Sequence, residues 1–283
     1  MSKALSIRAK LLYIAKKENI AFQVILLRYI HERFLYRLSI SKYKNNFYLK
    51  GGNFIYAIEG LLARPTKDID LLGQDIANDM DNLKNAIVEI ANTKCKEDFV
   101  VFNTKTISID PITEKNLYNG VRIKLNAGFD TTKQNIQIDI GFGDNIIPKP
   151  TTLAYPTLLQ ESTVPILTAY TLETVIAEKF HAMIELSTLN SRMKDFYDVY
   201  VLLTKGTYNK DTLSKAVQNT FKNRKTVINP GHTIFTEDFR NNPQRNKMWN
   251  VFLKKINYTK DDLTFEKVMK KIEKILKPLI LLK

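Results

Sequence analysis

Two aspartates placed two residues apart are the residues of this sequence best suited to chemistry. Asp68 and Asp70 lie in the short apolar segment DIDLL, which predicts a strand. Because side chains alternate along a strand, both carboxylates leave one face while Ile69 and Leu71 point into the core. Two carboxylates at such a short distance repel one another unless a cation lies between them. The pair therefore predicts a site for Mg²⁺ (or Mn²⁺), which prefers oxygen ligands and is often shared with substrate phosphates.

A third carboxylate could come from a later strand. Ile136, Ile138 and Ile140 alternate with Gln137 and Asp139, which predicts a strand with one buried and one polar face. Asp139 would then reach the pair from a neighbouring position in the sheet. Three carboxylates suit a two-metal site of the phosphoryl-transfer kind.

A double glycine precedes the aspartate pair. Gly51-Gly52 lies between a predicted strand, 47–49, and a predicted helix, 53–62. Backbone without side chains lets N–H groups approach a phosphate closely. One helix and a turn separate Gly52 from Asp68, the connection needed to bring both to one sheet edge. A Gly-Gly pair by itself usually marks a turn, and a DxD pair by itself is usually two solvated charges. The prediction of a metal and phosphate site therefore depends on the two motifs occurring together.

The elements that must position these residues form a mixed α/β half followed by a helical half. Helical spacing of apolar residues follows Asn19 as far as Leu38, with Arg28, Arg33 and Arg37 largely off the apolar stripe. The remaining predicted elements are a strand at 68–72, a helix at 79–94, strands over 98–143 with a hairpin of 121–129 and 136–142, and helices at 171–187, 193–204, 211–223, 244–256 and 262–276. The proline-rich stretch 148–165 is interpreted as the interdomain connection.

We therefore expect two domains. Residues 1–150 would form the α/β domain with N-terminal basic helices, and residues 151–283 a helical domain that completes the active site and carries a basic surface.

Composition excludes several classes of protein. The 283 residues are 44% hydrophobic and 25% charged, which excludes collagen-like and wholly disordered chains. A single cysteine, Cys95, excludes a disulfide framework, and three widely separated histidines show no metal-ligand spacing. No stretch approaches the ~20 apolar residues of a membrane span. We expect a soluble, cytoplasmic protein without membrane partners.

Charge is distributed unevenly along the chain. Residues 1–50 hold 11 Lys/Arg and 2 Asp/Glu, a net charge of +9, and residues 205–283 hold 18 and 7, a net of +11. Residues 51–204 carry −6. These flanks are either solvated faces of a lysine-rich chain or surfaces that hold a polyanion beside an acidic centre.

One lysine lies within an apolar helical stripe. Lys179 follows Val175 and Ile176 by four and three residues in the predicted helix 171–187. An inward lysine needs an anionic partner, whereas one at the edge of the stripe can extend to solvent. Asp195 and Asp198 share one side of the next helix, where pairing with Arg192 or Lys194 is the structural alternative to a role in the site.

Three blocks of the sequence resemble a known family. KGGNFIYAIEGLLARPTKDIDLL (50–72) resembles the first motif of DNA-polymerase-β-like nucleotidyltransferases, and in particular of the AbiEii/AbiGii toxin family. YTLE (170–173) with AEKFHAM (177–183) is similar to that family's second block, and NSRMKDFYD (190–198) to its third. The resemblance covers residues 47–204. One departure is that many relatives carry Gly-Ser in the first motif where this chain has Gly51-Gly52 followed by Asn53.

The resemblance implies a nucleotidyltransferase-fold sheet flanked by helices and an enzyme that uses an NTP and a divalent metal. It implies metal ligands Asp68, Asp70 and Asp139, with Lys179 and Asp195 as further catalytic residues. We expect the nucleotide to contact Lys50, Gly51, Gly52 and Lys179. Lys179 would neutralise phosphate charge, and Asp195 would orient Lys179 or the acceptor. Asp139 would help a second metal or a base activate the acceptor hydroxyl.

The biological role implied is that of a toxin in a bacterial toxin–antitoxin or phage-defence pair, with a cognate antitoxin as partner. Some relatives modify the 3′ end of tRNA, so RNA, and tRNA in particular, is the expected acceptor. Two alternatives stay open: transfer of a nucleotide to a protein side chain, and an inactive fold that only binds RNA or a partner. Three intact carboxylates disfavour the inactive fold, because a polyanion-binding module gains nothing from a negative cluster.

Overall fold

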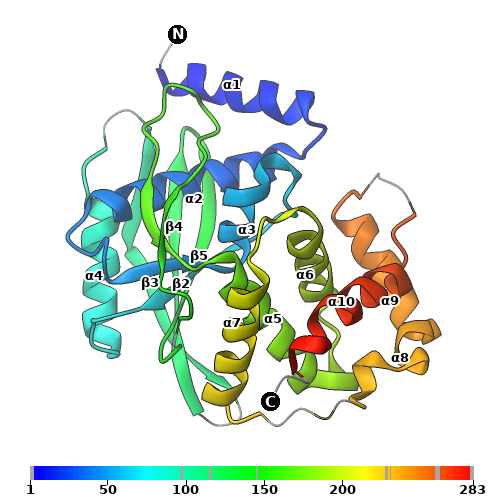
Figure 1. Ribbon diagram of the computed structural model, residues 1–283. Helices are drawn as coiled ribbons and strands as arrows, with labels where there is room; N and C mark the ends of the chain where they lie inside the picture. Colours follow the sequence, from blue (N-terminus) through cyan, green and yellow to red (C-terminus); the bar gives the residue numbers. More distant parts are fainter. Residues whose placement is uncertain are drawn as a thin grey trace. The chain divides into compact units, whose positions relative to one another are not determined.

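The computed structural model describes residues 3–95, 98–114, 117–144, 146–226, 229, 231–258 and 262–280 (Figure 1). The chain divides into two units. Unit 1 comprises Met1–Gly143 and Thr151–Ala169, and unit 2 comprises Asp144–Pro150 and Tyr170–Lys283. No helix in the described ranges is both long and apolar enough to cross a membrane.

Unit 1 is built on a mixed sheet. In the described part of the chain it has seven strands in the order β3-β4-β5-β2-β1-β7-β6. Their bounds are β1 Phe47–Lys50, β2 Asp68–Gly73, β3 Val100–Glu114, β4 Leu117–Phe129, β5 Thr132–Gly141, β6 Thr151–Ala154 and β7 Ile166–Ala169. β2 pairs antiparallel with β1 and parallel with β5, so the aspartate strand is central in the sheet. The predicted mixed sheet flanked by helices is confirmed.

The alternation of apolar and polar residues correctly predicted the β4–β5 hairpin. Ile136, Ile138 and Ile140 are fully buried, whereas Gln137 and Asp139 between them are partly exposed. The same alternation in β2 buries Ile69 and Leu71 and leaves the two aspartates half-buried. Each strand therefore presents its polar positions to one face, which places the candidate residues together.

The stretch 148–165 is not only a connection, as its prolines suggested. β6 lies within it and pairs with β7, and β7 lies parallel to β1 through Leu49 and Ala169. Both strands are four residues long, too short for alternation to reveal them. β6 is the edge strand and β7 lies between it and β1, so nearby prolines need not donate to a ladder on the outer side of β6. Residues 151–169 consequently belong to unit 1 and residues 144–150 to unit 2. Along the sequence, the chain therefore passes from unit 1 to unit 2 and back again around the expected boundary at 150.

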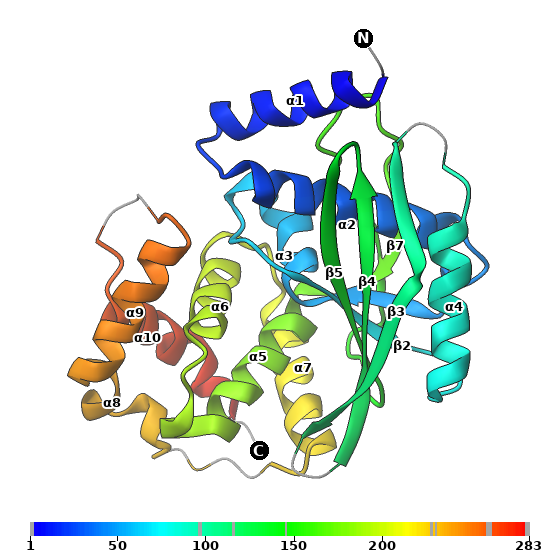
Figure 2. The same cartoon turned by 180° about the vertical axis from the view of Figure 1, so that it is seen from behind.

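The α-helices in the described part of unit 1 are α1 Lys3–Lys17, α2 Phe22–Ile40, α3 Gly51–Glu59 and α4 Met80–Asn92. Both views show α2 running across the sheet with α1 lying along it (Figures 1 and 2). Apolar residues on several sides of α2 are buried, among them Leu26, Tyr29, Phe34 and Leu38.

The arginines of α2 correct an expectation from the sequence. Arg28, Arg33 and Arg37 are buried rather than displayed on a basic surface. Arg37 donates to both carboxylate oxygens of Asp98 at 2.6 and 3.1 Å, and Arg33 lies 2.7 Å from the Glu32 carboxylate. Because buried charges need partners, these side chains serve the packing of unit 1 and are not available to a polyanion.

Unit 2 is helical in its described residues. Its longer elements are α5 Leu172–Leu186, α6 Met193–Lys205, α7 Lys210–Asn223, α8 Glu237–Asn241, α9 Pro243–Lys255 and α10 Phe265–Leu276. Asn and Thr side chains cap several of these helices by accepting a hydrogen bond from a backbone N–H of the first turn. Thr171 does so for α5 and Thr264 for α10. Phe196, Phe239 and Phe265 pack with ring centroids 5.2–6.2 Å apart, and Trp249 joins them.

Candidate active site

A row of charged residues crosses four adjacent strands of unit 1. Lys50 of β1 is in register with Asp70 of β2, Asp70 with Asp139 of β5, and Asp139 with Arg122 of β4. Residues paired across strands point to the same face of a sheet. Asp68 lies one position further along that face of β2. The row thus consists of two carboxylates flanked by a cation on each side.

The double glycine lies directly against Asp70. The N–H of Gly52 donates to Oδ2 of Asp70 at 3.3 Å. Gly51 has φ +64°, and a Cβ at this position would lie 2.0 Å from that same oxygen. A Cβ on Gly52 would lie 2.4 Å from Oγ1 of Thr66. Only glycine fits at either position, because the space that a side chain would take is filled by Asp70 and Thr66.

Asn53 anchors the strand that carries the aspartates. Its Nδ2 donates to the backbone oxygen of Asp68 at 2.7 Å, and its Oδ1 accepts from the Tyr155 hydroxyl at 2.8 Å. Its Nδ2 also lies 3.4 Å from Nδ1 of His31, and since an amide nitrogen only donates, Nδ1 is the acceptor. Burial lowers the pKa of His31 to about 4, so this imidazole is neutral near pH 7.

The sequence marked Asn53 only as a departure from the Gly-Ser pattern. Its partners carry no sequence signal, because His31 is 22 residues away and Tyr155 is 102 residues away. Through Asn53 these residues hold the backbone of Asp68, and no motif in the sequence points to them.

Asp139 is engaged by two neighbours on its own face. Arg122 donates from Nε to Oδ1 at 3.0 Å and from Nη2 to Oδ2 at 2.7 Å. Nε2 of Gln137 lies 3.1 and 3.2 Å from the same two oxygens. The hydrogen bond to Asp139 raises the pKa of the Arg122 guanidinium, and the charge of Asp68 adds to the rise. The alternating pattern of its strand points to Asp139, whereas Arg122 is one of many polar residues on such a strand.

The donor set of this face fits a hard divalent cation at the aspartates of β2. Mg²⁺ keeps several waters and commonly takes only one or two protein carboxylates beside substrate phosphates, which Asp68 and Asp70 can provide. The glycine backbone packed against Asp70 supports the fit by holding one carboxylate in place. Within the described ranges, no three His, Cys, Asp or Glu side chains are grouped so that they could hold a metal together. Asp139 faces Arg122 instead of completing such a group.

Unit 2 contains a largely buried lysine, partly exposed at 14%, between two buried carboxylates. Nζ of Lys179 on α5 lies 2.8 Å from Oδ1 of Asp195 and 2.8 Å from Oδ2 of Asp198, both on α6. The three side chains are 14%, 4% and 0% exposed, which excludes the alternative that Lys179 extends to solvent. Arg192 also reaches Asp195, at 3.2 Å. The predicted need of an inward lysine for anionic partners is confirmed.

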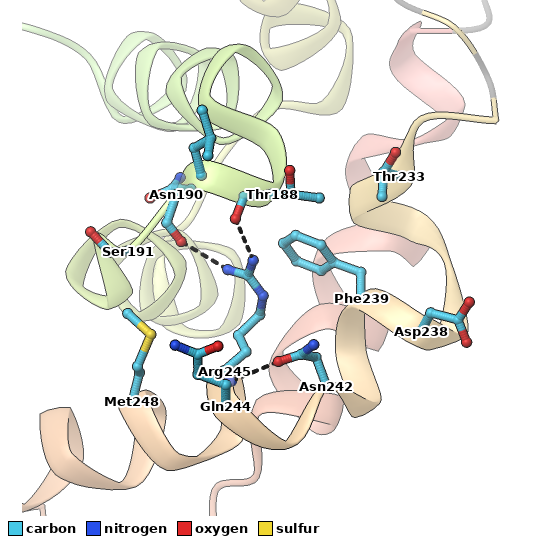
Figure 3. A pocket seen from close by; sticks show the side chains of 11 residues that line it. Thr188, Asn190, Ser191, Thr233, Asp238, Phe239, Asn242, Gln244, Arg245 and Met248 are labelled. Carbon is cyan, nitrogen blue, oxygen red and sulfur yellow. Dashed lines mark hydrogen bonds between the residues drawn. The ribbon is translucent and has the colours of Figure 1, made fainter.

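Arg245 of α9 fixes the loop that leads into α6. It lines a cavity of about 500 Å³ and donates to the backbone oxygens of Asn190 at 2.8 Å and Thr188 at 3.0 Å (Figure 3). Its guanidinium carbon lies 4.0 Å from the centroid of the Phe239 ring. Burial lowers the pKa of Arg245. This clamp holds the backbone just before the first turn of α6, which carries Asp195, and no motif in the sequence marked it.

Comparison with known proteins gives one family and one fold. A family model described as "Nucleotidyl transferase AbiEii toxin, Type IV TA system" matches residues 33–273. JHP933 from Helicobacter pylori is similar in structure, with a TM-score of 0.54, 12% identity, and coverage of 92% of this chain and 93% of that one. A second H. pylori structure, described as a candidate nucleotidyltransferase, has a TM-score of 0.51 and 12% identity, with coverage of 93% of this chain and 96% of that one. No curated protein matches the chain.

Proposed function

The chain belongs to the AbiEii family of nucleotidyl transferase toxins, and from this premise we propose that it transfers a nucleoside monophosphate from an NTP to an RNA acceptor, the 3′ end of a tRNA. The observation that carries the proposal is the sheet face of unit 1, where Asp68 and Asp70 lie beside a glycine backbone and in register with Asp139. The family description also implies a cognate antitoxin as partner. We propose the cytoplasm as the place of this reaction, because NTPs and tRNA are its substrates.

The reaction exchanges one bond for another at the α-phosphorus. The acceptor hydroxyl oxygen bonds to this phosphorus, the bond to the bridging oxygen breaks, pyrophosphate leaves with the electron pair, and the hydroxyl proton passes to solvent. A divalent metal bound by Asp68 and Asp70 would supply neutralisation of the triphosphate charge. The backbone of Gly51 and Gly52 holds Asp70 in place, and Asn53 holds the backbone of Asp68. The contribution of the chain is therefore chiefly positioning.

Within unit 2, Lys179 is our candidate for contact with a phosphate. The Lys179 side chain is flexible, but its ammonium group is held in one position by Asp195 and Asp198. Asp195 has the role of orienting this lysine, which agrees with the short distance between them. Arg245 acts one step further away, on the loop before Asp195.

RNA is favoured over a protein acceptor by the charge of the C-terminal region. Residues 205–283 carry a net charge of +11, and on α10 Lys267, Lys270 and Lys274 are exposed. The arginines of α2 are buried and contribute nothing to such a surface. If RNA lies on α10, charge reversal at Lys270 and Lys274 should reduce the slope of log K against log salt by about 0.7–0.9 per lost phosphate contact.

The test is incubation of the purified protein with each α-labelled NTP, Mg²⁺ and total RNA, followed by separate nuclease and protease digestion. We expect one NTP to label RNA of tRNA length, with the label sensitive to nuclease and absent when EDTA replaces Mg²⁺. Label that survives nuclease and is removed by protease would instead assign a protein acceptor. Absence of label in both fractions, with folded protein and all four NTPs, would contradict the proposal.

A further inference from the structure

The ion pair between Arg122 and Asp139 engages both oxygens of the carboxylate. An ionised carboxylate has about four lone-pair positions. Two face the Arg122 fork at 3.0 and 2.7 Å, and Gln137 lies 3.1 and 3.2 Å from the two oxygens. A metal ion at Asp139 would therefore either displace the Arg122 fork or bind a carboxylate whose charge a guanidinium already offsets.

The geometry of this pair is set by the sheet and not by chance contact of surface side chains. Arg122 and Asp139 are direct partners in the antiparallel β4–β5 ladder, and their neighbours Val121, Ile123 and Ile138 are fully buried. The backbone positions of both residues are thus fixed by core packing on the opposite face. Arginine also suits the place by chemistry, since its planar fork matches a carboxylate bidentately.

A purely stabilising role does not account for the pair. The side chains are 40% and 17% exposed, and ion pairs with that exposure contribute little to folding. The pair lies instead beside Asp70, whose position in β2 is in register with Asp139. A cation here offsets the repulsion that a third carboxylate adds to the aspartates of β2.

We propose that Arg122 is a built-in cation of the active site, which occupies Asp139 and keeps a second divalent metal ion away from it. Resting on the proposed function, this inference makes the site of the enzyme a one-metal site at Asp68 and Asp70. Arg122 supplies at Asp139 the positive charge that a second metal would otherwise supply. Asp139 is then the counter-ion of Arg122 rather than a metal ligand.

The test is Mn²⁺ binding, measured by calorimetry and by the EPR signal of free Mn²⁺ in the absence of nucleotide. Wild type should bind one Mn²⁺ with appreciable affinity. Arg122→Gln should gain a second Mn²⁺, bound at least about tenfold more tightly than any second ion in wild type. The reason is that the substitution removes the positive guanidinium beside Asp139, which repels a metal cation. The double variant Arg122→Gln with Asp139→Asn should lose this second ion.

Two further variants control the experiment. Lys124→Gln removes a positive charge from the same face of β4, one position along, where Lys124 is in register with Gln137. It should leave the stoichiometry at one, which separates the specific contact from general charge. Arg122→Lys keeps a charge but loses the fork, and it should give a second-ion affinity between those of wild type and Arg122→Gln. It also serves if the glutamine variant fails to fold, as judged by thermal unfolding.

The outcomes separate this inference from the proposed function. Two ions bound by wild type, with affinities that Arg122→Gln does not change, would overturn the role of Arg122 and leave the nucleotidyl-transfer site intact. If Asp70→Asn leaves Mn²⁺ binding of wild type unchanged, the metal site on β2 itself fails, and the proposed function fails with it. A second ion that persists in the double variant would show that it binds elsewhere and would also overturn the inference.

Discussion

Replacement of Gly51 by alanine tests how Asp70 is held. A Cβ at residue 51 would lie 2.0 Å from Oδ2, 2.5 Å from Cγ and 2.7 Å from Cβ of Asp70. Since ordinary van der Waals contact begins near 3.4 Å, the carboxylate must withdraw by more than about 1 Å. A misplacement of ~1 Å can lower a rate about 100-fold. We therefore expect kcat/KM for nucleotide transfer to fall about 100-fold, which corresponds to ~2.7 kcal/mol.

Gly60 provides the matched control. It has φ +60°, close to the +64° of Gly51, and nothing lies within 4 Å of the place where its Cβ would be. Gly60 has ψ −139°, so alanine there carries backbone strain alone, whereas alanine at Gly51 adds the contact with Asp70; the two variants are therefore compared at equal folded fraction. Only Gly51→Ala should lose activity and weaken Mn²⁺ binding.

The assay compares initial rates of label transfer from NTP for the two variants, each corrected for its folded fraction from urea unfolding. If Gly51→Ala keeps activity within about threefold of Gly60→Ala at equal folded fraction, then the glycine does not position Asp70. The close packing of the double glycine would in that case serve the fold alone.

Three further predictions concern buried charges. Lys179→Met should lower the free energy of unfolding, measured by urea titration, by about 3–5 kcal/mol, because two buried carboxylates lose a partner at 2.8 Å. Adding Asp198→Asn should restore part of the lost stability, because it removes one of the two unpaired charges. His31→Asn should make the free energy of unfolding less sensitive to acid. His31 has a pKa of about 4 in the folded chain and near 6.5 in the unfolded chain, so protons favour unfolding as the pH falls. Between pH 7 and pH 5 wild type should therefore lose about 2 kcal/mol more stability than the variant. Arg37→Met should cost about 3–5 kcal/mol by leaving Asp98 buried without its guanidinium partner, yet should not change the salt dependence of RNA binding by the folded protein.

Local patterns in the sequence predicted the sheet face that carries the candidate site. The alternation in β2 and β5 fixes which side chains share a face, and it correctly set Asp68 and Asp70 apart from the core. The lysine within the apolar stripe of α5 likewise required an anionic partner, which Asp195 and Asp198 provide. These inferences depend only on period and burial, so a single sequence suffices for them.

The identity of long-range partners could not be predicted in this way. Arg37 has the spacing of a helix-surface residue, and its partner Asp98 lies 61 residues later in the chain. Arg122 meets Asp139 only because β4 and β5 pair in one particular register. Strands as short as β6 and β7 leave too few residues for alternation to appear. In each case the missing information is which segments the fold brings together.

The most direct measurement of the central claim is the rate of label transfer from NTP to RNA by Asp70→Asn, compared with wild type at equal folded fraction. The replacement keeps the shape of the side chain but removes the charge that would bind the metal. We expect transfer to be lost, and adding Asp68→Asn should make it little worse, because the two carboxylates act as a unit. Transfer by Asp70→Asn at a rate near that of wild type would contradict the account, since the chemistry would then not depend on the aspartates of β2.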